Sequence, residues 1–384
     1  MKQVRVGIIG CGNIGQVHMS NFARVRGLKF TASATNNTHR RDQIRRDYAV
    51  EVFEDGQKLM ESGLVDAVLI ATPHYSHPRY AIAALKRGLH VLTEKPIAVT
   101  AKAAAVVEKE HAKHPEQVYA AMFQTRCSPL WKRVKRIVSE GQIGEVQRFS
   151  WIVTNWFRTQ RYYDSSAWRA TWRDEGGGVL INQCPHNLDT ICWVLGSPAR
   201  VRASVSLGKY HHIEVEDEVT ACLEWENGAT GTFITTTGEA PGTDRLEIAG
   251  DRGKLVVEEG RIKLTQTHQS VSRFCKECDE AFGAPRTDRI MIEVDCDTPG
   301  HVELTQNFIH AILHGEKLIC PAREGMWSLE LGNAMLMSGL TGESVRIPTP
   351  RHKYDRMIRE LAEKSTFKKG KVRKAKVDMA GSFH

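Results

Sequence analysis

No stretch of this chain approaches the roughly 18 consecutive apolar residues that a membrane-spanning helix requires. The N-terminal MKQVRVGIIGCG lacks a small-residue cleavage site and leads directly into a glycine motif, so we interpret it as a strand and not as a signal peptide. The nine cysteines are scattered and odd in number, which does not indicate a disulfide framework and is typical of a reducing compartment. We therefore expect a cytoplasmic protein with no membrane partner.

Acidic residues are missing from the basic segment KKGKVRKAK, residues 368–376, which holds six positive charges. The formal net charge of the chain is +8, so the rest carries only about +2. We interpret the basic segment as part of a solvated C-terminal extension, residues 351–384, and expect no nucleic-acid partner. The 384 residues leave room for two domains of roughly 150 residues each.

The first 124 residues alternate between short β-branched runs and amphipathic helical stretches. Helices are predicted, for example, at residues 13–26 and 77–88. Strands are predicted for the runs VRVGIIG, KFTASAT, VDAVLIAT and HVLTE. This alternation predicts an N-terminal α/β domain, residues 1–124, with a doubly wound parallel sheet.

The pattern changes after about residue 125. Long runs with period-2 alternation follow one another without helices between them: RVRASVSL, EVTACLEW, ATGTFITTT, RLEIAG and KLVVEE. A helix is predicted from Val179 to Leu195, two more at residues 302–314 and 324–338, and irregular structure at residues 266–300. We expect a C-terminal α+β domain, residues 125–350, with a large, mostly antiparallel open sheet and helices to one side.

The motif GCGNIG, residues 10–15, stands between a predicted strand and a predicted helix. Gly10 permits the tight turn, Gly12 lets the backbone approach a pyrophosphate, and Gly15 allows close helix packing. The helix that begins near Asn13 and Ile14 presents free N–H groups to an anion. The context predicts dinucleotide binding; a purely structural glycine turn is the alternative.

A carboxylate is also missing at the end of the second predicted strand, where it would bind the ribose 2′-OH of NAD. The stretch there is ATNNTHRR, with Thr35 and Asn36 followed by Arg40 and Arg41. Two guanidinium groups without a carboxylate favour a 2′-phosphate, whereas a solvated helix start is the alternative interpretation of the arginines. We expect NAD(P) as cofactor, with a preference for NADP.

Three segments in this order resemble the Gfo/Idh/MocA oxidoreductase family: GCGNIG, ATPHYSHPRYAIAALKRGLHVLTEKP and GGGVLINQCPHNLD. The resemblance covers roughly residues 3–345. It implies a Rossmann domain, a second domain whose open sheet commonly makes dimer contacts, and NAD(P)-dependent oxidation or reduction of sugars, cyclitols or related polyols. It therefore implies a carbohydrate or polyol substrate and a homodimer or homotetramer.

The resemblance assigns catalysis to Lys95 and His186. Lys95 follows a strand at the edge where open α/β sheets bind ligands. Pro96 fixes the chain exit, and we expect a cis bond between the two residues. His186 would take the hydroxyl proton while hydride leaves the same carbon, and the ammonium of Lys95 would stabilise the alkoxide. The alternative interpretations are that Lys95 is only a solvated lysine at a strand end and that His186 has a purely structural role.

Asn182 departs from the family, which commonly carries aspartate four residues before this histidine. An amide orients hydroxyl groups but supplies no negative charge and accepts no proton. His186, held by Asp189, would then do more of the work. The spacing i, i+4 and i+7 predicts that Asn182, His186 and Asp189 share one helical face.

Loop positions and the resemblance add further site residues. Aromatic rings stack on pyranose rings and arginines bind hydroxyl groups, although packing is an equal alternative for Tyr163 and Trp172. The predicted substrate contacts are Asn182, Asp189, Arg126, Tyr163 and Trp172. The predicted cofactor contacts are Gly10, Gly12, Asn13, Ile14, Gly15, Thr35, Asn36, Arg40, Thr72, Pro73, His77, Glu94, Lys95, Gln124, Trp168 and Arg169.

A metal is not expected. Cys275 and Cys278 lack a convincing second pair of ligands, for which only Cys296 and His301 are available. A second acidic and histidine-rich segment, residues 211–217, fits a polar strand entry.

Two other functions remain open. Some family members are redox-neutral NAD-dependent glycosidases that act through a transient keto-sugar, and Tyr162 or Tyr163 would supply the base for that chemistry. A non-catalytic cofactor-binding regulator is the second alternative.

Overall fold

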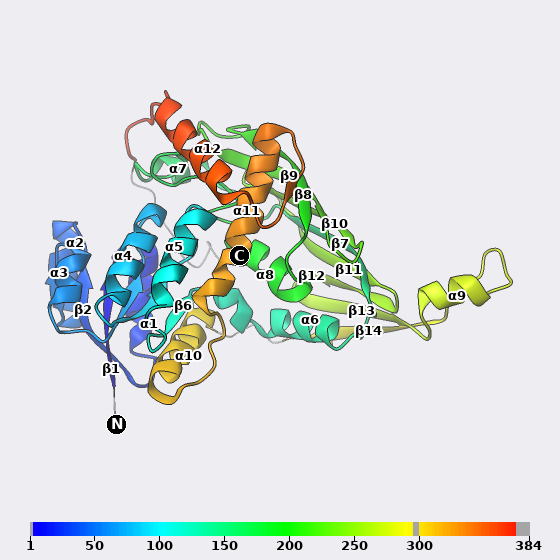
Figure 1. Ribbon diagram of the computed structural model, residues 1–384, viewed down its shortest axis with the longest axis horizontal. Coiled ribbons are helices and arrows are strands. Elements are labelled where there is room, and N and C mark those ends of the chain that lie inside the picture. The colour runs from blue at the N-terminus through cyan, green and yellow to red at the C-terminus, as the bar shows by residue number, and fades with distance from the viewer. Residues whose placement is uncertain (1–2, 295–298, 374–384) are drawn as a thin grey trace.

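The computed structural model of the protein describes residues 3–294 and 299–373. Figure 1 shows two units side by side, each with a sheet, and helix α11 (Gly325–Thr341) lying between them. Each unit has its own apolar core, one around Ile8 and Leu69 and the other around Trp151 and Phe233. The predicted fold class is confirmed: a doubly wound parallel sheet precedes an α+β unit with a large, mostly antiparallel sheet.

The first sheet is parallel, with the described strands in the order β3-β2-β1-β4-β5-β6. The order reverses between β1 and β4, which is where open α/β sheets bind ligands. Its strands are β1 (Val4–Ile9), β2 (Leu28–Ala34), β3 (Glu51–Phe53), β4 (Ala67–Ile70), β5 (His90–Thr93) and β6 (Tyr119–Ala121). Its helices are α1 (Asn13–Phe22), α2 (Thr38–Tyr48), α3 (Gly56–Glu61), α4 (His77–Leu85) and α5 (Ala101–His111).

The second sheet has the order β14-β13-β12-β11-β7-β10-β9-β8-β15 in the described residues, and only β7 and β10 pair in parallel there. Alternating burial, as in β9, places one face of each strand on the core. The strands are β7 (Val146–Val153), β8 (Arg200–Leu207), β9 (Glu216–Glu224), β10 (Thr230–Thr236), β11 (Asp244–Gly250), β12 (Gly253–Glu258), β13 (Arg261–Thr267), β14 (Thr287–Glu293) and β15 (Val345–Arg346).

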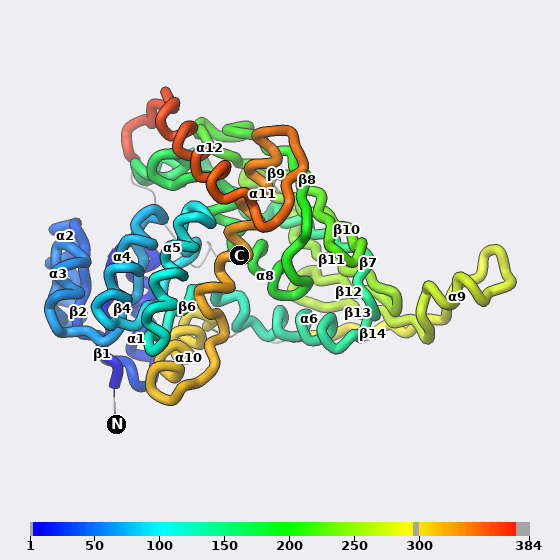
Figure 2. Tube along the Cα trace, in the orientation of Figure 1, coloured from blue at the N-terminus to red at the C-terminus, as the bar shows by residue number. Residues whose placement is uncertain are grey.

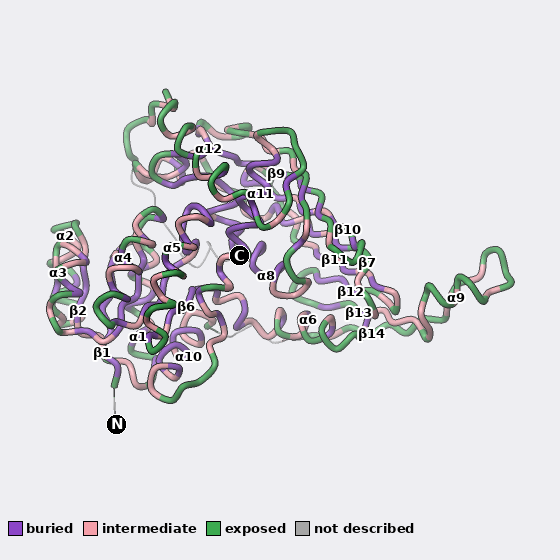
Figure 3. The backbone as a smooth tube through the Cα atoms, in the orientation of Figure 1, coloured by how far each residue is buried: buried purple, intermediate pink, exposed green. Residues whose placement is uncertain are grey.

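Helices connect the two units. Figure 3 shows that α8 and α11 are largely buried, whereas α9 projects from the sheet and is exposed. Helix α10 returns to the first unit and packs against α1, β1 and β5. The remaining elements are α6 (Pro129–Ser139), α7 (Gln160–Asp164), α8 (Pro185–Leu195), α9 (Val271–Glu277), α10 (Gly300–His314), α12 (Arg351–Lys364) and the short helices η1 (His74–Ser76), η2 (Gln124–Cys127) and η3 (Ala322–Glu324).

The structure corrects three expectations about elements. The helix predicted from Val179 begins only at Pro185, because the preceding loop packs on β9 and Pro185 suits a first helical position. Residues 266–300, predicted as irregular, contain α9 and β14. The expected solvated extension begins with α12, which buries Tyr354 and Ile358. Across the described residues, no helix has the length and apolar character to cross a membrane.

Candidate active site

The glycine loop between β1 and α1 leaves open space above Gly12. Gly10 has a φ of 98°, and a Cβ there would lie 2.5 Å from the carbonyl oxygen of Ala71. A Cβ on Gly15 would lie 2.2 Å from the Gly10 oxygen, so Gly15 lets α1 approach the loop. At Gly12 the nearest described atom is Arg40 Nη1, 3.9 Å away.

The N-terminus of α1 faces this space. The helix begins at Asn13 and Ile14, has no acidic residue in its first turn, and has no side-chain cap among the described residues. Its first backbone N–H groups are therefore available to an anion. Open space over Gly12 and uncapped N–H groups fit the pyrophosphate of a dinucleotide.

The adjoining end of β2 is basic. Arg40 Nη1 donates to the carbonyl oxygen of Cys11, within the glycine loop. Arg41 Nη1 donates to the Thr35 oxygen at 3.0 Å, and Asn36 is exposed beside it. Asn37 caps α2 by accepting the Arg40 N–H. Residues 35–41 contain no carboxylate, so a ribose at this edge would meet a guanidinium and amides.

The turn after β5 holds Lys95, and the expected cis bond between Lys95 and Pro96 is present. His77 ties this turn to the loop after β4: its Nε2 lies 2.7 Å from the Thr72 oxygen and its Nδ1 lies 2.7 Å from the Pro96 oxygen. Pro73 precedes η1 in the same loop. His77 therefore joins the two loops and fixes the turn that carries Lys95.

Lys95 meets the segment before α8 in the second unit. Its Nζ donates to the backbone oxygen of Asn182 at 2.6 Å. Because α8 begins at Pro185, Asn182 lies before the helix, and the predicted common helical face with His186 and Asp189 is wrong. The contact nevertheless brings Lys95 to the segment that leads into His186.

His186 is half-buried and near enough to Lys95 to feel its charge. Burial and, to a smaller extent, the positive charge of Lys95 lower the pKa of His186 to about 3. Its Nε2 lies 3.2 Å from Gln124 Nε2, and its Nδ1 is buried without a hydrogen-bond partner in the described structure. The imidazole is therefore neutral near pH 7. The Gln124 amide nitrogen can only donate, so Nε2 is the unprotonated nitrogen of this ring and the one that can accept a proton.

Arg126 and Asp189 are engaged with each other. Arg126 Nε and Nη2 donate to the two Asp189 oxygens at 2.8 and 2.7 Å, and both side chains are fully buried. Arg126 Nη1 also bonds Glu324. Arg126 and Asp189 were predicted to contact the substrate, but their polar atoms are bonded to each other and to Glu324. Asp189 therefore pairs with Arg126 and not, as predicted, with His186. The ion pair instead clamps η2 to α8, which keeps Gln124 beside His186.

Two aromatic side chains predicted to contact substrate lie in the core of the second unit. Trp172 and Tyr163 are 3% and 4% exposed. The Tyr163 hydroxyl lies 2.8 Å from Thr237 Oγ1, and its ring packs against His211. Tyr163 and Trp172 are therefore packing residues, and the prediction that they contact the substrate is wrong.

Arg169, Trp168 and Tyr162 form a partly exposed cluster. Arg169 Cζ lies 4.3 Å from the Tyr162 ring centroid and 4.7 Å from that of Trp168, and Nη1 donates to the Tyr162 hydroxyl at 2.7 Å. Trp168 also contacts the ring of His74 from the loop after β4. The cluster offers ring faces and N–H donors beside the Lys95 turn.

Sequence reasoning missed four residues around this site. His18 Nε2 lies 2.7 Å from Glu94 Oε1, and the rings of His18 and His301 are 5.4 Å apart. Burial raises the pKa of Glu94, but the bond and charge of His18 lower it overall to about 2. Glu94 Oε2 accepts the Lys95 N–H at 3.1 Å, so Glu94 fixes the turn. His74 and Glu175 are the other two residues. His74 lies in the segment ATPHYSHP and His301 was considered only as a metal ligand, while no motif or spacing pointed to His18 or Glu175.

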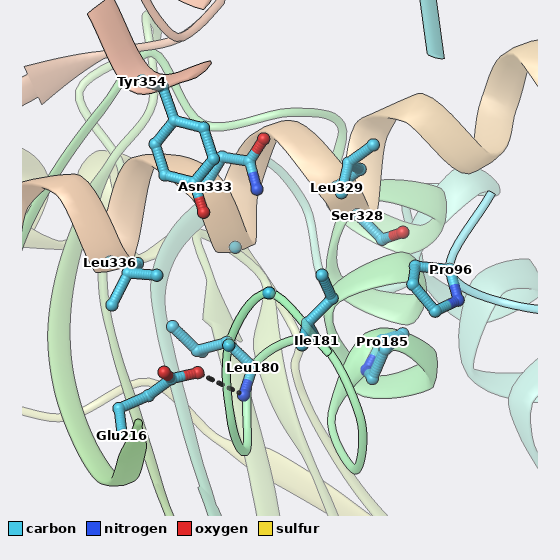
Figure 4. Close-up of a pocket in the computed structure, with 13 residues that line it drawn as sticks. Pro96, Leu180, Ile181, Pro185, Glu216, Ser328, Leu329, Asn333, Leu336 and Tyr354 are labelled. Atoms are coloured by element: carbon cyan, nitrogen blue, oxygen red, sulfur yellow. Dashed lines mark hydrogen bonds between the residues drawn. The ribbon is translucent and has the colours of Figure 1, made fainter. Parts of the chain in front are cut away.

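Gly178 lets the loop before Asn182 pack closely against Glu216 on β9. Glu216 Oε1 accepts N–H groups from Gly178 at 2.9 Å and Leu180 at 3.2 Å, and Figure 4 shows Glu216 at the edge of the small cavity that this loop forms with α11 and Tyr354. A Cβ on Gly178 would lie 1.9 Å from the Glu216 backbone oxygen. Burial raises the pKa of Glu216 to about 7.

His211, which was considered as a metal ligand, makes hydrogen-bond contacts within the protein. His211 lies between Asp217 Oδ2 and the Arg158 oxygen, at 3.0 and 2.7 Å. In the described part of the chain, no three His, Cys, Asp or Glu side chains are grouped to hold a metal ion. Cys296 lies outside the described residues.

Two family models match the chain. Residues 4–122 match "Oxidoreductase family, NAD-binding Rossmann fold", and residues 131–256 match "GFO/IDH/MocA C-terminal domain". The chain is 30% identical to inositol 2-dehydrogenase of Rubrobacter xylanophilus over 91% of its length and 94% of the relative. It is 24% identical to the NAD(+)-dependent scyllo-inositol 2-dehydrogenase of Bacillus subtilis, over 91% and 98% of the two chains.

Solved structures show the same fold. The WlbA dehydrogenase of Bordetella pertussis, in complex with NADH and UDP-GlcNAcA, has a TM-score of 0.76 at 26% identity over 90% of this chain and 99% of that chain. A levoglucosan dehydrogenase in complex with NADH and L-sorbose has a TM-score of 0.77 at 20% identity, over 91% and 100%.

Proposed function

This chain belongs to the Gfo/Idh/MocA oxidoreductase family, and from that premise we propose that it is an NAD(P)-dependent dehydrogenase of a sugar, glycoside or cyclitol. The reaction is hydride transfer between a secondary hydroxyl carbon and the nicotinamide. The observation that carries the proposal is the contact of Lys95, at the carboxyl end of β5, with the Asn182 backbone just before His186. Lys95 and the glycine loop follow the carboxyl ends of two strands, β5 and β1, of the same parallel sheet, and the loop fits a dinucleotide.

A nicotinamide bound at this sheet edge would supply the acceptor for the hydride of the substrate carbon. His186 takes the hydroxyl proton, so the O–H and C–H bonds break as the carbonyl forms. Lys95 donates a hydrogen bond to the substrate oxygen and stabilises the negative charge that develops there. Gln124 holds the ring of His186, and His77 holds the Lys95 turn.

A polyhydroxylated substrate is supported by the cluster next to Lys95. Trp168 and Tyr162 offer ring faces, and Arg169 offers guanidinium N–H groups. Aromatic faces and planar donors of this kind suit a sugar or cyclitol ring. The inositol dehydrogenases among the relatives support the same substrate class.

The preference for NADP over NAD is part of the proposal. It rests on Arg40 beside the glycine loop and on the lack of a carboxylate in residues 35–41. The NADH bound by two related structures supports the opposite preference for those proteins. The ratio of kcat/KM for the two cofactors decides between them.

The cytoplasmic location and the homodimer or homotetramer also remain predictions. The second sheet packs α6 and α11 on its core side, and its other face presents exposed ion pairs such as Arg148–Glu247. We expect two or four copies to associate through this sheet. Light scattering after gel filtration measures the mass, and a monomer at micromolar concentration would contradict the prediction.

A cofactor-reduction screen tests the function. Purified protein is incubated with sugars, inositols and glycosides, with NAD and NADP separately, and absorbance at the reduced nicotinamide band is followed. We expect reduced cofactor to accumulate with at least one polyol, and a loss of about 10²–10⁴-fold in kcat for His186→Ala. Cofactor binding without its reduction by any sugar, inositol or glycoside, and without release of an aglycone, would favour a non-catalytic regulator.

A redox-neutral glycosidase is the second candidate, and one observation favours it. The Tyr162 hydroxyl accepts N–H groups from Arg169 at 2.7 Å and from Gln183 at 3.3 Å, so it is held in place within the cluster beside Lys95. Tyr162 would then remove a proton next to the transient carbonyl. Release of aglycone without net cofactor reduction identifies this function, and Tyr162→Phe should abolish the release.

A further inference from the structure

Glu175 is a buried carboxylate that the reaction as proposed does not use. It stands directly before the three glycines and is 2% exposed. Its Oε2 accepts the Ala170 N–H, and its Oε1 accepts the Asn182 side-chain amide. Its backbone oxygen lies 3.2 Å from His74 Nδ1. An ionisable group is costly to bury, so its presence here calls for a function.

Asn182 connects Glu175 to Lys95. The side-chain amide of Asn182 donates to Glu175, while its backbone oxygen accepts from Lys95 Nζ at 2.6 Å. In the family this position commonly holds an aspartate, which would place a carboxylate beside the lysine. In this chain the carboxylate belongs to Glu175, which reaches Lys95 only through Asn182, because the Asn182 side-chain amide is bonded to Glu175.

Charges of both signs surround Lys95. Burial lowers the pKa of Lys95, and the carboxylates of Glu94 and Glu175 oppose that shift. Burial raises the pKa of Glu175, and the Arg169 guanidinium, two hydrogen bonds and the Lys369 ammonium oppose it. The titratable and charged groups that act on Lys95, or on which it acts, are Glu94, Glu175, Arg169, Cys184, His74, His77, His186 and His301.

We propose that Glu175 is a positioning residue that replaces the missing aspartate: it fixes Asn182 and supplies the negative charge that keeps Lys95 an ammonium ion. This inference rests on the proposed function, because it deepens the role of Lys95 in it. Glu94 is already bonded to His18, which leaves Glu175 as the carboxylate joined to the segment that Lys95 contacts.

Two measurements on Glu175→Gln test the proposal. The first is the pH profile of kcat/KM, whose alkaline limb reports loss of the ammonium form of Lys95. The second is the pH dependence of acetylation of Lys95 by acetic anhydride, followed by mass spectrometry, which needs no turnover. Because the variant removes a negative charge, both midpoints should move to lower pH by about one unit.

Adding a carboxylate at another position distinguishes an effect of the negative charge of Glu175 from an effect of its support of the loop. The double variant Glu175→Gln/Asn182→Asp returns a carboxylate to the position the family uses, so both midpoints should return toward their original values. Glu108→Gln removes a half-buried carboxylate on α5 and should leave both midpoints unchanged.

Different results would overturn the two proposals. An unmoved Lys95 midpoint in Glu175→Gln, or a shift that Asn182→Asp does not reverse, would show that Glu175 only supports the loop. Absence of any hydride transfer by the unaltered protein would instead reject the proposed dehydrogenase. In that case the pH midpoint of Lys95 acetylation would still show whether Glu175 affects the charge state of Lys95.

Discussion

At the scale of single residues, the site depends on groups whose charge state is set by their surroundings. Burial and the charge of Lys95 lower the pKa of His186 to about 3, so its imidazole is neutral. Burial also lowers the pKa of Lys95, and the carboxylates of Glu94 and Glu175 oppose that shift. A neutral imidazole beside an ammonium ion is the pairing that alcohol oxidation requires, because one accepts the proton and the other stabilises the oxygen.

Arg40 provides a test of cofactor preference. Arg40→Ser removes the guanidinium beside the glycine loop, so KM for NADP should rise by about tenfold or more, as loss of a charge-assisted hydrogen bond predicts. KM for NAD should change little. Arg46→Ser, an exposed position on the same helix, is the matched control. Equal effects of Arg40→Ser on both cofactors would contradict the preference for NADP.

Single residues with a motif could be predicted from the sequence, whereas those defined by tertiary contacts could not. Lys95 and the glycine loop belong to local patterns, and both lie at the predicted sheet edge. The partner of Asp189 is 63 positions away in Arg126, and no spacing rule contains that pairing. Glu175 was missed for the same reason: its neighbours are brought to it by the loop that packs on β9.

At the scale of elements, the short helix η2 and helix α8 are joined by a buried ion pair. Breaking such a pair leaves an unpaired buried charge, so Asp189→Ala should lower the free energy of unfolding by about 3–5 kcal/mol. Glu140→Ala breaks the exposed pair with Arg136 and should cost less than about 1 kcal/mol. Denaturant unfolding of both variants measures the two decreases in the free energy of unfolding. Equal decreases would contradict a stabilising role of the buried Arg126–Asp189 pair.

The segment after α12 is the second element with a testable contribution. Figure 2 shows the chain turning from α12 back toward α7. Arg373 N donates to the Asp164 oxygen at 3.0 Å, and Lys369 Nζ donates to the backbone oxygen of Arg169. These contacts place residues 365–373 over the cluster that is proposed to receive the substrate.

Truncation after Lys364 should therefore raise KM for the substrate several-fold, with a smaller effect on KM for the cofactor. A chain that ends at Arg373 keeps all the described contacts of this segment and is the matched control. Steady-state kinetics compares the two, and an unchanged substrate KM in the shorter chain would contradict the contribution of residues 365–373.

Element boundaries show where sequence patterns lose information. The apolar periodicity of residues 179–184 resembles that of a helix, but the backbone N–H groups of Gly178 and Leu180 bond Glu216 instead. Likewise, α12 was included in a basic extension because charge dominates its composition. Its buried side chains, Tyr354 and Ile358, are apparent only once the surface they cover exists.

At the scale of the whole molecule, the two sheets could be predicted because their patterns are long and repeated. Alternating strands and helices implied the parallel sheet, and uninterrupted period-2 runs implied the antiparallel one. The return of α10 to the first unit could not be predicted in this way, because a helical period does not identify the sheet on which a helix packs.

Several enclosed histidines make stability depend on pH. Burial lowers the pKa of His74, His77, His186 and His301, in the last case to about 4. In the unfolded chain these groups titrate near a pKa of about 6.5. Below that pH the unfolded state binds protons that the folded state does not, so stability falls as pH drops from about 6.5 toward 4.

Thermal unfolding between pH 7 and pH 5 should accordingly show a falling Tm, by about 2–4 °C for each kcal/mol lost. His301→Asn should flatten this slope, whereas His268→Asn, at an exposed position, should not. A Tm that stays constant from pH 7 to pH 5 would contradict the neutral, enclosed state of these rings.

The central claim is that Lys95 and His186 bring about hydride transfer from a polyol carbon. The most direct measurement uses a substrate from the screen with deuterium on that carbon and follows the label by mass spectrometry of the recovered cofactor. The account predicts one deuterium in the reduced nicotinamide, and a rate lower by at least about 10²-fold in Lys95→Ala and His186→Ala with cofactor binding retained. Transfer of label at an unaltered rate in both variants, or its release to solvent without entering the cofactor, would contradict it.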